Sequence, residues 1–130
     1  MNKSMNFAGR VLMAQIFLLS GISKVSAYTA TQGYMDAMGV PGALLPAVIA
    51  LEIGAAVALL IGFQARVAAL ALAGFSIVSG FIFHADFADQ MQTIMFMKNL
   101  AMAGGLLAIA ATETRNTFGI DAYRLNYARN

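Results

Sequence analysis

The chain contains no cysteine, and only 11% of its 130 residues are charged. Without cysteine, the protein itself cannot form a disulfide, offer a thiolate nucleophile, carry a persulfide or ligate an iron–sulfur cluster. Soluble domains carry roughly 25% charged residues, so this low charge content excludes an ordinary soluble fold. The net charge of +2 and the lack of any run of basic residues also exclude a nucleic-acid-binding surface.

Hydrophobic residues are abundant instead, and they make up 60% of the chain. A helix needs about 20 mostly apolar residues to cross a membrane. Four segments have about this length, at residues 7–24, 42–62, 65–83 and 92–111. We therefore predict an all-α integral membrane four-helix bundle, in which residues 1–130 form a single transmembrane domain.

The first segment also resembles a secretory signal, because Lys3 and Arg10 precede an apolar run that ends in Val25-Ser26-Ala27. However, Lys24 lies close to the position where cleavage would occur, and three more hydrophobic segments follow. We interpret the segment as the first membrane helix.

The positive charges predict the orientation of the bundle. Most of them fall on the side that carries both termini and the tight turn at residues 62–66, namely Lys3, Arg10, Arg66, Arg115, Arg124 and Arg129. The positive-inside rule therefore predicts cytoplasmic termini. Asp36, Asp86 and Asp89 fall on the opposite, outer side.

The remaining segments are expected to be connections and a tail. Residues 25–41 read as a longer connection with Gly33, Gly39 and Pro41 as breakers, and residues 84–91 as a short acidic loop. Residues 112–130 form a short cytoplasmic tail that either lies in the headgroup region or is frayed. Small residues at four-residue spacing, such as Ala69 and Ala73 or Gly54 and Ala58, predict close helix packing.

Glu52 is the most informative polar residue, because it lies about ten residues into the second segment, near the middle of the membrane. An ionised residue there costs roughly 2.5–3.5 kcal/mol, so Glu52 is expected to face the bundle interior. We predict that Lys98 is its partner and treat both as candidate catalytic residues. The alternatives are a structural ion pair, or a Lys98 side chain that extends outward to the headgroups.

Four further polar residues are candidates for ligand binding: Asn99, Lys24, Arg10 and His84. Asn99 follows Lys98 and offers donors and acceptors, and Lys24 ends the first helix on the outer side. Arg10 begins the first helix at the cytoplasmic surface. Lys24 has a simpler explanation as a membrane-surface anchor, and Arg10 as an orientation signal.

His84 is the only histidine, and it lies near Asp86 and Asp89 in the sequence. One histidine and two aspartates are a weak metal signal, so we predict no metal site there. The loop is expected to cap the third helix or to take up protons.

Aromatic residues suggest an apolar wall beside the charged cluster. Phe75, Phe81 and Phe83 in the third segment and Phe96 in the fourth are suited to enclosing a flat lipophilic ligand, and Phe81 is counted among the ligand-binding candidates. The alternative is that they pack or face lipid.

Several short motifs occur in the same order as in a known family: Arg10, Ser20-Gly21-Ile-Ser-Lys24, Gly39-Val40-Pro41, Leu51-Glu52-Ile-Gly54, Gly62-Phe-Gln-Ala-Arg66, His84, Lys98-Asn99 and Gly104-Gly105. Over nearly the whole chain, this pattern resembles the DoxX family of small four-helix inner-membrane proteins. The resemblance implies a multi-pass protein of the bacterial inner membrane. The family is named after a subunit of a thiosulfate:quinone oxidoreductase, and related proteins are linked to thiol-redox assemblies. This chain is shorter than that archetype, so thiosulfate oxidation is not assigned to it.

The resemblance and the residues together favour a quinone-linked or redox-associated membrane subunit, with a buried polar site open to the outer face. Quinone or another lipophilic molecule is the candidate ligand, and a protein of a membrane redox assembly is the candidate partner. Two alternatives stay open: a small proton-coupled transporter, in which Glu52 binds and releases protons, and a non-catalytic scaffold for a soluble oxidoreductase. Whether the protein is an enzyme, and whether it forms a homo-oligomer, is left open.

Overall fold

Four long helices dominate the computed structural model, which describes residues 2–129. They are α1 (Lys3–Ser26), α3 (Leu45–Ile61), α4 (Ala65–Phe83) and α5 (Gln90–Ala111). The short 3-10 helix η1 (Gly42–Leu44) runs directly into α3, which extends that unit to 20 residues. All four units are long and apolar enough to cross a membrane. The predicted all-α membrane protein with four spanning helices is confirmed.

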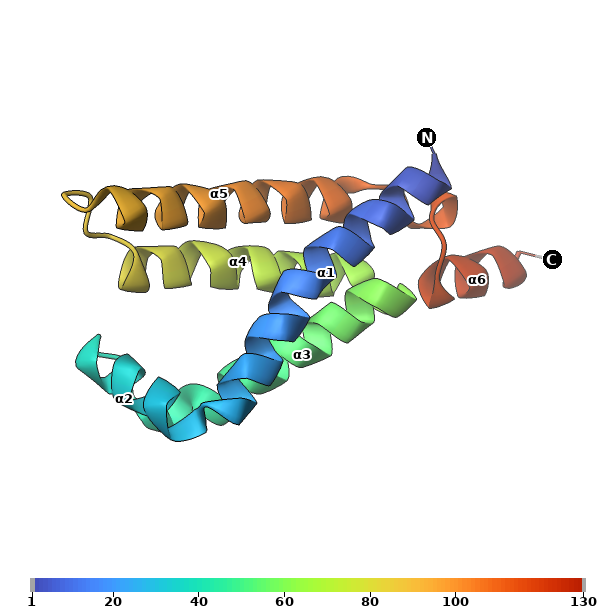
Figure 1. The fold of residues 1–130 in the computed structure, drawn as a ribbon. Coiled ribbons are helices and arrows are strands. Elements are labelled where there is room, and N and C mark those ends of the chain that lie inside the picture. Colours follow the sequence, from blue (N-terminus) through green and yellow to red (C-terminus); the bar gives the residue numbers. More distant parts are fainter. Residues whose placement is uncertain (1, 130) are drawn as a thin grey trace.

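The four helices are arranged as two antiparallel pairs. α1 packs mainly against α3, and α4 packs mainly against α5. The pairs lie close together at the end that carries both termini and diverge toward the other end (Figure 1). Where they meet, their contact is an apolar core built largely of alanine and leucine with one phenylalanine, including Ala14, Phe17, Leu59, Leu72 and Leu106.

The connection between α1 and α3 contains a helix that the sequence did not predict. α2 (Tyr28–Ala37) occupies most of residues 25–41, and Gly33 lies within it. α2 is attached to η1 by two hydrogen bonds: Gln32 Nε2 donates to the Gly42 carbonyl at 3.1 Å, and the Gly42 N–H donates to Asp36 Oδ1 at 2.7 Å. Gly39 then reverses the chain with a φ of +82°.

The C-terminal tail is folded onto the end of the bundle. It forms η2 (Thr114–Asn116) and α6 (Ile120–Tyr127). The Asp121 N–H donates to the Gly62 carbonyl at 2.9 Å, and Asp121 Oδ2 accepts the Ala65 N–H at 3.1 Å. Asp121 thereby supplies a cap at the start of α4, so the tail is attached to the turn between α3 and α4 and is not frayed.

Small residues contribute to packing unevenly. Ala69 and Ala73 are buried in the core, as their spacing predicted, whereas Gly54 has open space beside it. Gly21 is the position where α1 comes closest to α3, because a Cβ there would lie 2.6 Å from Ile53 Cγ1. Close approach of these two helices therefore requires glycine at this position.

Gly21→Ala is expected to lower the free energy of unfolding by about 1–3 kcal/mol, because the added methyl group forces Ile53 and the α3 backbone to move. Thermal unfolding of the purified protein in detergent micelles measures the loss. Gly9→Ala on the same helix is the matched control, since a Cβ at Gly9 meets nothing within 4 Å. Equal stability of the two variants would contradict this account of the α1–α3 contact.

Candidate functional site

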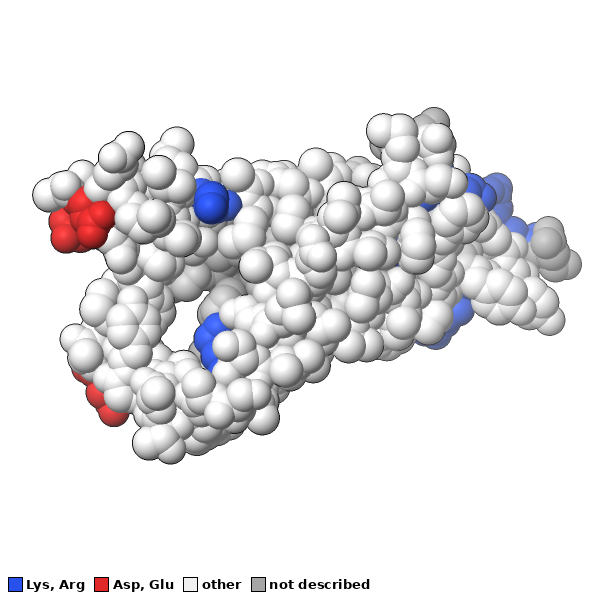
Figure 2. Space-filling model, in the orientation of Figure 1, with Lys and Arg blue, Asp and Glu red and all other residues white. Residues whose placement is uncertain are grey.

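A pocket of about 670 Å³ opens where the two helix pairs diverge. Its lining residues come from α1, α2, α3, α4 and α5, together with Val40 and His84 from the connections. Figure 2 shows the hollow at this end of the molecule. Pockets that bind small molecules have volumes of roughly 300–1,000 Å³, so this one is large enough for a ligand.

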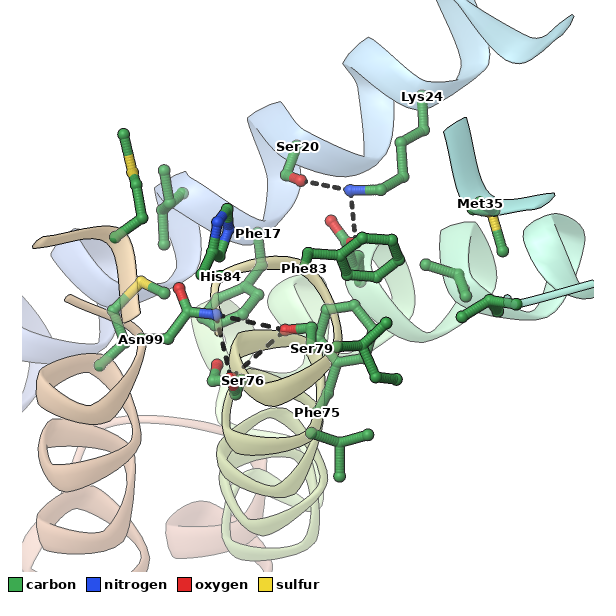
Figure 3. A pocket seen from close by; sticks show the side chains of 18 of the residues that line it. Phe17, Ser20, Lys24, Met35, Phe75, Ser76, Ser79, Phe83, His84 and Asn99 are labelled. Carbon is green, nitrogen blue, oxygen red and sulfur yellow. Dashed lines mark hydrogen bonds and ion pairs between the residues drawn. The ribbon is translucent and has the colours of Figure 1, made fainter. Parts of the chain in front are cut away.

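An ion pair between α1 and α3 lies in the wall of the pocket. Lys24 Nζ is 2.7 Å from Glu52 Oε1, and it also donates to Ser20 Oγ at 2.6 Å. The Glu52 side chain is 1% exposed, whereas that of Lys24 is 24% exposed. The buried carboxylate therefore has a partner that reaches it from the more accessible part of the pocket (Figure 3).

The prediction that Lys98 is the partner of Glu52 was wrong. α5 packs against α4, so Lys98 lies on the α4–α5 side of the pocket, whereas α1 runs directly along α3. Lys98 still lines the pocket, with an exposed side chain. The two lysines thus enter the same pocket from different helix pairs.

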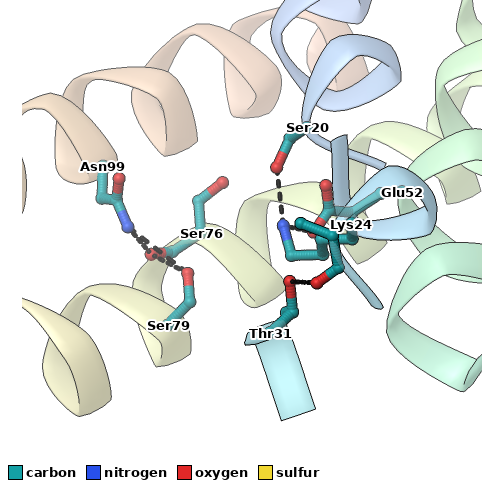
Figure 4. A network of polar contacts seen from close by, with 8 residues as sticks. Ser20, Lys24, Thr31, Glu52, Ser76, Ser79 and Asn99 are labelled. Atoms are coloured by element: carbon teal, nitrogen blue, oxygen red, sulfur yellow. Dashed lines mark hydrogen bonds and ion pairs between the residues drawn. The ribbon is translucent and has the colours of Figure 1, made fainter. Parts of the chain in front are cut away.

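A second polar group lies on the α4–α5 side. Asn99 Nδ2 donates to the Ser76 carbonyl at 3.0 Å and to Ser79 Oγ at 3.3 Å. Figure 4 shows this group across from the Lys24–Glu52 pair, with Ser20 at the α1 side. Asn99 was predicted as a site residue, whereas Ser76 and Ser79 were not. Their only sequence signal is two hydroxyls at i and i+3 on one face of an apolar helix.

Two buried oxygens of this pocket lack a hydrogen-bond partner among residues 2–129. They are Glu52 Oε2 and Ser76 Oγ, whose residues are 0% and 1% exposed. A buried polar atom without a partner costs about 1–3 kcal/mol, so such atoms are rare unless water or a ligand completes them. Both residues line the pocket, which is therefore equipped to bind a polar group.

Aromatic residues and His84 surround the wider end of the pocket. The Tyr34 ring of α2 stacks on the Phe83 ring of α4, with centroids 5.3 Å apart and an interplanar angle of 27°. This stack joins α2 to the second helix pair. His84 Nδ1 lies 3.0 Å from Gln92 Oε1, so the histidine is oriented by α5 beside the pocket.

Of the four phenylalanines expected to form a wall, Phe75 and Phe83 line the pocket, and Phe81 and Phe96 do not. Phe81 is 59% exposed and contacts Phe96 edge-on at 5.0 Å. The helical period explains the difference, because Phe81 lies roughly 160° around α4 from Phe83. Phe81 therefore does not contribute to this site.

Arg10 is also not part of the pocket. Its side chain is buried at the end of the bundle that carries the termini, where the guanidinium donates to the Phe118 carbonyl. A Cβ at Gly62 would lie 2.6 Å from an Arg10 Nη atom, so this turn needs glycine to make room for the arginine. The structure places Arg10 in the contact between α1 and the tail.

Lys24→Met keeps the apolar stem of the side chain and leaves Glu52 without a cation. We expect the free energy of unfolding to fall by on the order of 2–3 kcal/mol, less than for a fully buried pair because Lys24 is 24% exposed. Adding Glu52→Gln should restore most of that loss. Chemical unfolding in micelles measures both effects.

Lys98→Met is the matched control, because it removes a lysine from the same pocket without touching the ion pair. It is expected to change stability by less than about 1 kcal/mol. A loss of unfolding free energy as large as that of Lys24→Met would mean that Lys98 does pair with Glu52.

The sequence of the chain is similar to a protein family and to two proteins of known sequence. The family model described as DoxX matches residues 5–85. The chain is 48% identical over 103 residues to the inner membrane protein YqjF of Escherichia coli (strain K12), covering 79% of each chain. It is 30% identical over 110 residues to the inner membrane protein YphA of the same organism, again covering 79% of each. No solved structure matches the chain.

With four spanning helices and relatives of this kind, the protein is a multi-pass inner-membrane protein. The family match covers more than half of the chain and includes Lys24, Glu52, Ser76 and Ser79 of the pocket. The chain belongs to the DoxX family.

Proposed function

We propose that this protein binds a lipophilic molecule with a polar head, of the quinone class, in the pocket between its helix pairs, and that it acts as a redox-associated membrane subunit. The observation that carries the proposal is a pair of buried oxygens in a largely apolar pocket, Glu52 Oε2 and Ser76 Oγ, which have no hydrogen-bond partner in the described part of the chain. A lipophilic ligand with polar atoms at one end matches that combination.

The donors and acceptors of the pocket fit a quinone ring. Ser76 Oγ can donate to a carbonyl oxygen, and so can the third N–H of Lys24, whose other two are directed at Ser20 and Glu52. The hydroxyl of a reduced quinol can donate to Glu52 Oε2. Phe75, Phe83 and Tyr34 supply flat apolar surface beside these groups.

The residues also suit proton exchange at such a ligand. A bound quinone would supply the capacity to accept two electrons, which the cysteine-free chain itself does not provide. Glu52 is placed to accept a proton from a hydroxyl of the ligand, beside the Lys24 ammonium group. The electrons are then expected from a partner protein or from a reduced substrate that reaches the open end of the pocket.

We further propose that both termini are cytoplasmic and that the pocket opens toward the outer side. Lys3 begins α1, Arg66 lies in the first turn of α4, and Arg115 and Arg124 lie in η2 and α6. These elements lie at the end of the bundle with the termini, whereas the α4–α5 loop with Asp86 and Asp89 lies at the other end (Figure 1). This distribution follows the positive-inside rule.

The orientation can be tested on a cysteine-free background, because the chain contains no cysteine. Ala88→Cys places a thiol in the α4–α5 loop, and Asn126→Cys places one in α6. We expect a membrane-impermeant maleimide to label Ala88→Cys in intact spheroplasts and Asn126→Cys only after lysis. The reverse pattern would overturn the proposed orientation.

Ser76→Ala tests ligand binding most sharply, because it removes from the pocket a buried hydroxyl that has no hydrogen-bond partner within residues 2–129. We expect affinity for a short-chain ubiquinone analogue, measured by isothermal titration calorimetry in micelles, to fall roughly 3–10-fold. Unfolding free energy should be unchanged or higher, because no internal hydrogen bond is lost. A stability loss without any change in affinity would show that the hydroxyl is structural.

Glu52→Gln should weaken binding of the same analogue, and Glu113→Gln is its matched control, since Glu113 is exposed and lies outside the pocket. If the wild-type protein binds no quinone, the proposal fails. Proton-coupled flux in proteoliposomes that is lost in Glu52→Gln would then indicate a carrier.

A further inference from the structure

A second cleft lies at the opposite end of the bundle, between the start of α4 and α6. Its volume is about 580 Å³. The lining residues come from the α3–α4 turn, the first turn of α4, η2 and α6: Gln64, Arg66, Val67, Thr114, Asp121, Arg124, Leu125 and Ala128. None of them lines the pocket near Glu52.

Two arginines from separate elements meet in this cleft. Arg66 Nε donates to the Ala110 carbonyl at the end of α5 at 2.9 Å, which fixes the position of its guanidinium and leaves four further N–H groups. Arg124 extends from α6 with an exposed side chain. Across residues 2–129, neither arginine takes part in an ion pair.

One carboxylate also lines the cleft, and it already has partners. Asp121 Oδ2 accepts the Ala65 N–H at 3.1 Å, and the carboxylate lies within electrostatic range of Arg10. The two arginines therefore give the cleft an excess of positive charge. Arginine is suited to phosphate because its planar fork donates two parallel hydrogen bonds.

Exposed apolar residues also line the same cleft. Val67 is 61% exposed and Leu125 is 41% exposed, and both are part of the lining. Tyr123 and Tyr127 stack on each other on α6 with their rings largely exposed, as is common for tyrosines at a membrane–water interface. Such a combination of guanidinium groups and apolar surface matches a phospholipid better than a free phosphate ion.

The charge of the whole molecule points the same way. Most basic side chains lie at the end that carries the termini, whereas Lys24 and Lys98 lie at the pocket near Glu52. Figure 2 shows the visible acidic side chains at the opposite end. Basic residues near the membrane surface attract anionic lipids with about 1 kcal/mol each. The cleft lies at the basic end of the bundle.

We propose that this cleft binds the phosphate of an anionic phospholipid, with Arg66 and Arg124 on the phosphate and the start of an acyl chain along Val67 and Leu125. The bound lipid joins the first turn of α4 to α6. It thereby adds to the hydrogen bonds of Asp121 in attaching the tail to the bundle.

The test measures binding of phosphatidylglycerol, phosphatidylcholine and inorganic phosphate to the full-length protein, by native mass spectrometry from detergent micelles. We expect phosphatidylglycerol to bind in preference to phosphatidylcholine, without displacement by inorganic phosphate. Its affinity should fall roughly fivefold in Arg124→Gln and roughly 25-fold in the Arg66→Gln/Arg124→Gln variant. Arg124→Gln serves as the variant that keeps the fold, because the Arg124 side chain makes no hydrogen bond within residues 2–129.

Arg115→Gln/Arg129→Gln is the matched control, since it removes the same charge from the same end but outside the cleft. It should leave phosphatidylglycerol binding within about twofold of the wild type. Equal losses of phosphatidylglycerol affinity in both double variants would mean that general surface charge causes the binding. That result would overturn the proposed site. Equal binding of phosphatidylcholine, or displacement by inorganic phosphate, would overturn the assignment to an anionic lipid.

Discussion

A carboxylate buried between membrane helices must be paired or protonated, and much of this structure follows from how Glu52 is accommodated. Its partner, Lys24, lies near the end of α1, so α1 has to run close along α3. Gly21 allows that approach, and the short helix α2 returns the chain over a small distance. α1 packs along α3, and the α4–α5 pair diverges from the α1–α3 pair (Figure 1). The pocket forms where the two pairs separate.

The polar groups of the pocket are divided between the two helix pairs. Lys24 and Glu52 belong to the α1–α3 pair, whereas Ser76 and Asn99 belong to the α4–α5 pair. The first group is charged and internally paired, and the second is neutral and held by backbone and hydroxyl contacts. A ligand that meets both groups needs a polar head with donors and acceptors on two sides. A ring with oxygens at opposite positions has that property.

The spanning helices could be predicted because length and hydropathy alone determine them, and the burial of Glu52 followed from its depth. The partner of Glu52 could not be predicted, because Lys24 and Lys98 both lie toward the end of the bundle opposite the termini. The choice between them depends on which helices are neighbours. α2 was missed because Gly33 and Gly39 read as breakers, while its stabilising contacts to Gly42 join residues six and ten positions apart. Ser76 was missed because one hydroxyl in an apolar helix carries no signal of its own.

The separation of the two helix pairs has a thermodynamic consequence. Their shared core lies toward the termini, while at the pocket the pairs are joined mainly through side chains, such as the Tyr34–Phe83 stack. A molecule bound across the pocket contacts both pairs and so favours one angle between them. By linkage, anything that shifts this angle also changes the affinity of the pocket, and the coupling free energy is the same in both directions. Spanning helices adjust their tilt to the thickness of the bilayer. A thickness that altered this angle would therefore alter the affinity of the pocket.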